Sequence, residues 1–126
     1  MAPRVARFSI PGRLSGLNDM TAKQGRGRGF AYAAEKRKWT NDIVLLARAA
    51  RVPHFNRVHI AYRWVEANHK RDPSNIAAGG RKVAEDGLVL AKVLDNDGWK
   101  QIAGFSDAFE VGPKPGVEIT ITEVQT

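Results

Sequence analysis

Four aspartates occur within a short stretch of an otherwise basic chain, at Asp72, Asp86, Asp95 and Asp97. Carboxylate oxygens are hard ligands suited to Mg²⁺ or Mn²⁺, which keep bound water and accept phosphate oxygens as further ligands. A lysine in the same stretch, Lys82, could stabilise the negative charge that develops during phosphoryl transfer. These residue types together fit metal-assisted hydrolysis of a phosphodiester.

A purely structural interpretation of the same residues competes with the catalytic one. Asp72 precedes Pro73 and could serve only as a helix N-cap. Lys82 and Asp86 stand four residues apart and could form only a surface ion pair on a helix. Asp95 and Asp97 could be turn residues, because aspartate favours turns.

Other catalytic chemistries find less support in the sequence. The chain has no cysteine, which excludes a cysteine nucleophile, zinc thiolate sites and a disulfide framework. It also lacks a Gly-x-Ser-x-Gly elbow, and its three histidines, His54, His59 and His69, do not have the spacing of a zinc site. The aspartate-rich stretch is therefore the best candidate for chemistry.

The positive charge is concentrated in the N-terminal part. The net charge is +7, and residues 1–51 hold 11 of the 20 Lys and Arg residues but only three acids. Such an excess favours a polyanion, nucleic acid or an anionic membrane, although a solvated basic surface would look the same. The residues predicted to contact nucleic-acid phosphates are Arg13, Lys23, Arg26 and Arg28 in a glycine-rich loop, Lys36 on the first helix, and His69, Lys70 and Arg71 beside the aspartates.

Periodicity and turn signals predict the elements that position these residues. Strands are expected at 4–10, 57–66, 99–111 and 117–124, and helices at 31–51 and from Pro73 to about Leu90. The order predicts one α+β domain over residues 1–126, with two main helices on a small mixed sheet. No apolar run approaches the ~20 residues of a membrane span, so a cytoplasmic protein is expected.

The predicted second helix has a polar face and an apolar face. At 100° per residue, Asn75, Lys82 and Asp86 fall within about 40° of one another, while Ile76, Gly80, Val83, Gly87 and Leu90 form the apolar face. Gly79-Gly80 is unfavourable inside a helix, so either the helix starts after these glycines or the backbone closely approaches another element there. On the preceding strand, Val58, Ile60, Tyr62 and Trp64 are expected to point into the core.

Three segments resemble, in order and approximate spacing, the signature of RusA-type Holliday-junction resolvases, which are often carried by phages and prophages. They are Lys70-Arg71-Asp72-Pro73-Ser74-Asn75-Ile76, Arg81-Lys82-Val83-Ala84-Glu85-Asp86-Gly87-Leu88 and Val93-Leu94-Asp95-Asn96-Asp97-Gly98-Trp99. The resemblance implies a RusA-like fold and a homodimeric endonuclease that uses Mg²⁺ or Mn²⁺ to cut symmetric strands of four-way DNA junctions. A two-fold dimer suits this task, since each protomer can supply one active site.

Carried over by motif, Asp72 is the first catalytic carboxylate, Lys82 is the catalytic lysine and Asp97 is the late carboxylate. Asp72, Asp86 and Asp97 are the implied metal ligands, with Asp95 as the alternative to Asp97. The chain departs from the family pattern at Ser74, where the family usually has a second aspartate. The gap between Asn75 and Lys82 is also longer than in shorter family members.

Two alternatives to the nuclease stay open at this point. The first is a non-catalytic module that binds DNA junctions or structured nucleic acid, which the serine at position 74 favours. The second is an RNA-binding α+β domain in which Trp64 or Tyr62 is a stacking platform for bases.

Overall fold

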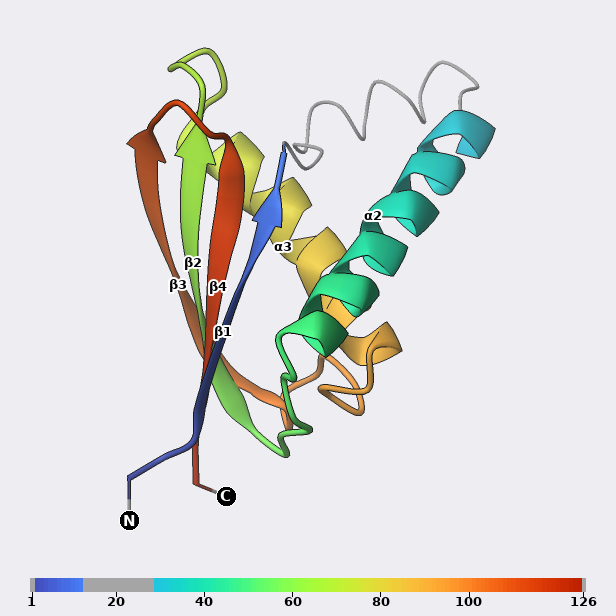
Figure 1. Cartoon of the computed structure of the whole chain (residues 1–126), viewed down its shortest axis with the longest axis vertical. Helices are drawn as coiled ribbons and strands as arrows, with labels where there is room; N and C mark the ends of the chain where they lie inside the picture. Colours follow the sequence, from blue (N-terminus) through green and yellow to red (C-terminus); the bar gives the residue numbers. More distant parts are fainter. Residues whose placement is uncertain (1, 13–28, 126) are drawn as a thin grey trace.

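A computed structural model of the chain describes residues 2–12 and 29–125, the side chains of residues 29–32 excepted. The described residues form a single four-stranded mixed sheet with two helices on one of its faces (Figure 1). The elements are β1 (Val5–Pro11), α2 (Gly29–Ala49), β2 (Val58–Glu66), α3 (Pro73–Leu90), β3 (Ile102–Val111) and β4 (Gly116–Glu123). The predicted α+β architecture is therefore confirmed.

The sheet has the strand order β1-β4-β2-β3. β4 is antiparallel to both β1 and β2, whereas β3 is parallel to β2. The parallel pair follows from the chain path, because α3 provides the crossover that two parallel strands require. The last two strands are consecutive but not neighbours, since β2 lies between them.

The alternating side chains of β2 make the centre of the core. Val58, Ile60, Tyr62 and Trp64 are all buried, as the alternation predicted. Tyr62 and Trp64 stack with ring centroids 5.2 Å apart. This corrects the idea that either ring is a stacking platform for RNA bases, because both rings are only 2–3% exposed.

The helix α3 begins where the sequence predicted. Asp72 is in an extended conformation and Pro73 occupies the first turn, although the Asp72 side chain caps no backbone N–H of the described residues. Its apolar face is buried at Ile76, Val83 and Gly87, but Leu90 is 53% exposed. The prediction that Leu90 faces the core was wrong, because the last turn of α3 buries Leu88, which is 0% exposed, and leaves Leu90 on its exposed side.

Two glycines set how closely α3 packs. A Cβ at Gly80 would lie 2.5 Å from Cη2 of Trp64, so the backbone of α3 packs directly against the indole ring of β2 at this point. A Cβ at Gly87 would lie 2.7 Å from Cγ2 of Ile43, where α3 crosses α2. The close approach offered as one explanation of Gly79-Gly80 is thus present at Gly80.

The element boundaries that differ from the prediction do so by one to three residues. The helix α2 ends at Ala49 rather than Arg51, which has a positive φ of 56°. The strand β3 begins at Ile102 rather than Trp99, because residues 98–101 form a tight turn in which Ile102 donates to the Gly98 carbonyl over 3.0 Å. Neither helix of the described part is long and apolar enough to cross a membrane.

Candidate active site

Lys82 on α3 brings two of the predicted aspartates together. Its Nζ lies 3.1 Å from Oδ1 of Asp86, one helical turn further along, and 3.3 Å from Oδ2 of Asp97, in the turn after α3. Lys82 is 54% exposed, whereas the two carboxylates are 25% and 27% exposed. The cluster therefore lies at the surface, with its ammonium group accessible from solvent.

A second lysine supports the same cluster from α2. Nζ of Lys36 lies 2.8 Å from Oδ2 of Asp86, so each oxygen of this carboxylate faces one ammonium group. Partial burial raises the pKa of Asp86, but the hydrogen bonds from Lys36 and Lys82 outweigh that effect and the pKa is lowered overall. The hydrogen bond to Asp86 raises the pKa of Lys82, with a smaller contribution from Asp97. Both pKa shifts favour the charged forms of Asp86 and Lys82.

Asp95 is directed elsewhere. Its Oδ1 lies 3.0 Å from Nε2 of His54, which belongs to the segment between α2 and β2. Asp95 is 75% exposed and pairs with this histidine rather than with Lys82. Of the two rival carboxylates in the turn, Asp97 is the one that meets the lysine of α3.

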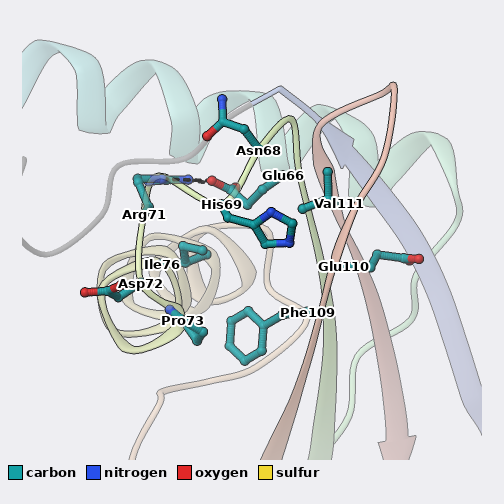
Figure 2. Close-up of a pocket in the computed structure, with 10 residues that line it drawn as sticks. All are labelled: Glu66, Asn68, His69, Arg71, Asp72, Pro73, Ile76, Phe109, Glu110 and Val111. Atoms are coloured by element: carbon teal, nitrogen blue, oxygen red, sulfur yellow. Dashed lines mark hydrogen bonds and ion pairs between the residues drawn. The ribbon is translucent and has the colours of Figure 1, made fainter.

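Asp72 lies at the other end of α3, beside a pocket of about 160 Å³. Lys82 follows ten residues later, which corresponds to about 15 Å along the helix axis. His69 and Phe109 line the middle of this pocket, and the Asp72 carboxylate points away from both rings (Figure 2). One protomer therefore separates Asp72 from the cluster of Asp86 and Asp97.

The basic residues next to Asp72 have different environments. Arg71 forms a two-pronged ion pair with Glu66, with N–O distances of 2.9 and 2.8 Å, and its side chain is only 9% exposed (Figure 2). His69 and Lys70 are exposed. The pair anchors the entry to α3, while His69 and Lys70 are accessible to a ligand. Arg13, Lys23, Arg26 and Arg28 lie outside the described residues.

A divalent metal ion such as Mg²⁺ would be held by carboxylate oxygens of the chain. Within residues 2–12 and 29–125, no three His, Asp or Glu side chains gather closely enough to hold a metal. Ser74 is exposed at the start of α3. It stands at the position where the family usually has a second aspartate, so the group near Asp72 lacks that carboxylate. A single protomer, in its described part, thus does not assemble the ligands that the resemblance implies.

Sequence reasoning missed one carboxylate next to the cluster, Glu85. It accepts a hydrogen bond from the Tyr62 hydroxyl over 3.2 Å. Burial raises the pKa of Glu85, the Tyr62 hydrogen bond opposes this, and the negative charge of Asp97 adds to the increase. Glu85 is adjacent to Asp86 in sequence, but only the tertiary contact with β2 distinguishes it from a solvated glutamate.

A second missed feature links α3 to β3. Asp107 accepts from Nε1 of Trp64 over 2.8 Å and forms an ion pair with Arg81, whose guanidinium lies 4.3 Å from the ring centroid of Phe105. The sequence contains a signal for this network, because Asp107 alternates with Phe105 and Phe109 on one side of the strand. An acid that faces inward needs a partner, so a basic or hydrogen-bonding residue opposite Asp107 could have been predicted. This network holds the α3 segment that carries Lys82 against the sheet.

Comparison of the chain with protein-family models and with curated proteins gives no match.

Proposed function

We propose that the protein is a structure-specific endonuclease of the RusA type that cuts four-way DNA junctions with Mg²⁺ or Mn²⁺. One observation carries the proposal: Lys82 contacts both Asp86 and Asp97 although the two aspartates are in different segments. These three residues come from two separate parts of the family signature. The structural interpretation explains the Lys82–Asp86 pair but not the recruitment of Asp97 in preference to Asp95.

The bound metal would supply charge neutralisation at the scissile phosphate and an acidified water. The chain's own contribution is electrostatic. The Lys82 ammonium group is exposed, so it can leave one of its carboxylate partners and contact a phosphate oxygen of the substrate instead. Its positive charge would then lie where the transition state gains negative charge. The exposed His69 and Lys70 would hold the DNA backbone near Asp72. We further propose that the protein acts as a homodimer in the cytoplasm.

Cleavage of a fixed four-way junction, with metal and with chelator, tests the proposal. Lys82→Ala should slow cleavage by about 100-fold, which is typical of a lost transition-state charge, with little change in junction affinity. Lys38→Ala is a matched control, because Lys38 forms a similar pair with Asp42 on α2, over 3.0 Å. Equal losses of rate and affinity in Lys82→Ala would reduce this residue to a phosphate contact.

A second candidate is a junction-binding module without nuclease activity. The observation that favours it is the set of ion pairs that already neutralises Asp86 and Asp97, together with the serine at position 74. Tight, salt-sensitive binding of the junction without cleavage at any Mg²⁺ or Mn²⁺ concentration would establish this module and refute the nuclease.

A further inference from the structure

Trp99 is the most exposed large apolar residue of the described part of the chain. It is 96% exposed, whereas Trp64 is buried and Trp39 is partly buried. Tryptophan is usually well covered in a folded protein, because its large ring gains much from leaving water. Single apolar residues do occur on ordinary surfaces, so the surroundings of Trp99 decide whether this ring has a function.

The turn that carries Trp99 has a firmly held backbone. The Gly98 carbonyl accepts hydrogen bonds from the N–H groups of Gln101 and Ile102, over 3.1 and 3.0 Å. The Gln101 carbonyl in turn accepts from the N–H of Val58 at the start of β2, over 2.8 Å. Because the backbone is already fixed, a ligand of the indole has to order only its two side-chain torsions. The ring is thus presented outward at a small entropic cost of binding.

The indole is next to the candidate active site. Trp99 follows Asp97 by two residues, which span at most about 7 Å of chain. Asp97 in turn lies 3.3 Å from Nζ of Lys82. A group bound to the indole would therefore be close to the phosphate that Lys82 is proposed to contact.

The charges around the ring favour a nucleic-acid base as its occupant. Lys100 is adjacent and exposed, and Lys82 is 54% exposed. An aromatic face beside accessible cations combines a stacking surface for bases with contacts to phosphates, which is how proteins hold unpaired strands. An apolar protein partner would instead cover these lysines without neutralising them.

We propose that the Trp99 indole stacks on a base at the branch point of a DNA junction, while Lys100 contacts the backbone of the same strand. Bases within a duplex are stacked on both faces, and a base that is already unpaired costs least to expose. Stacking does not depend on sequence, because every base has a π-face. Trp99 would therefore contribute a preference for branched over linear DNA. The contact rests on the junction-binding function proposed above.

Tryptophan emission tests the stacking without any cleavage. A fixed four-way junction is added in the presence of a chelator, and a linear duplex with the sequence of one arm is the second probe. Stacking on a base quenches indole emission, so the junction should quench the wild type more than Trp99→Phe, and more than the duplex does. Equal quenching of the two proteins by the junction, or of the wild type by both probes, overturns the proposal.

Junction affinity measured at several salt concentrations separates the stack from a phosphate contact. Trp99→Leu should bind the junction at least about fivefold more weakly, as expected for one lost stack, with an unchanged salt dependence. Lys100→Ala is the matched neighbour and should reduce the slope of log affinity against log salt by about one. Trp99→Phe should regain most of the affinity. Wild-type affinity in Trp99→Leu, or a reduced salt slope in that variant, overturns the stacking.

Cleavage assays separate this contact from the nuclease function. A wild type that cuts junctions although its emission does not change on binding overturns the stacking alone. Quenching by the junction without cleavage at any Mg²⁺ or Mn²⁺ concentration supports the stacking and refutes the nuclease. A wild type that binds no junction DNA overturns both.

Discussion

Replacement of Gly80 by alanine tests how α3, which carries Lys82, is held on the sheet. The added Cβ would lie 2.5 and 2.6 Å from Cη2 and Cζ3 of Trp64. This ring cannot easily move, because it is 3% exposed, stacks on Tyr62 and donates to Asp107 over 2.8 Å. The helix must therefore shift away from the sheet, or the ring must give up its hydrogen bond.

The expected loss of stability follows from two opposing effects. Overpacking a tight core costs up to about 3 kcal/mol. Alanine is better than glycine in a helix by about 1 kcal/mol, which offsets part of that cost. The net loss is about 2 kcal/mol, or a fall in Tm of about 8 °C for a domain of this size.

Thermal and urea unfolding of Gly80→Ala measure this loss. Ala78→Gly, at an exposed position of the same helix, is the control for helix propensity alone and should cost about 1 kcal/mol. In a Trp64→Phe background the penalty of Gly80→Ala should shrink, because the atoms that clash belong to the outer ring of the indole. A stabilising Gly80→Ala, or an equal penalty in both backgrounds, would refute the proposed contact.

Two further variants examine groups buried around the candidate site. Glu85→Gln keeps an acceptor for the Tyr62 hydroxyl and removes a carboxylate whose pKa is raised above its ordinary value of 4.5, mainly by burial. A carboxyl group with a raised pKa stabilises the fold at low pH, and this contribution is lost as the pH rises through the folded-state pKa. The Tm of Glu85→Gln relative to wild type should therefore increase between about pH 4 and pH 7. A Tm difference between the two proteins that does not change with pH would contradict the buried environment of Glu85. Arg71→Ala leaves Glu66 buried without its ion-pair partner and should cost about 3 kcal/mol in urea unfolding, less when combined with Glu66→Gln. A loss below about 1 kcal/mol would mean that the pair is effectively solvated.

The sequence predicted the central elements well where local and tertiary preferences agree. The alternation of β2 identified its buried side, because a half-buried strand requires period two. The Asp72-Pro73 pair identified the start of α3, because proline has no N–H to lose in the first turn. Leu90 was misplaced, since helical period alone does not tell which side of the last turn of a helix the neighbouring elements cover.

Sequence could not choose between Asp95 and Asp97. Both stand in one turn, and both suit it by composition. The choice depends on neighbours from distant segments, because His54 pairs with Asp95 whereas Lys82 pairs with Asp97. The partner of Glu85 was hidden for the same reason, because Tyr62 is 23 residues away on another element.

The central claim is that cleavage depends on Asp97, and single-turnover cleavage of a four-way junction by Asp97→Asn and Asp95→Asn tests it most directly. The two variants make the same chemical change two residues apart, so Asp95→Asn controls for lost charge in the turn. The account predicts a loss of at least about 100-fold for Asp97→Asn and near wild-type cleavage for Asp95→Asn. Equal rates in the two variants, or the larger loss in Asp95→Asn, would contradict it.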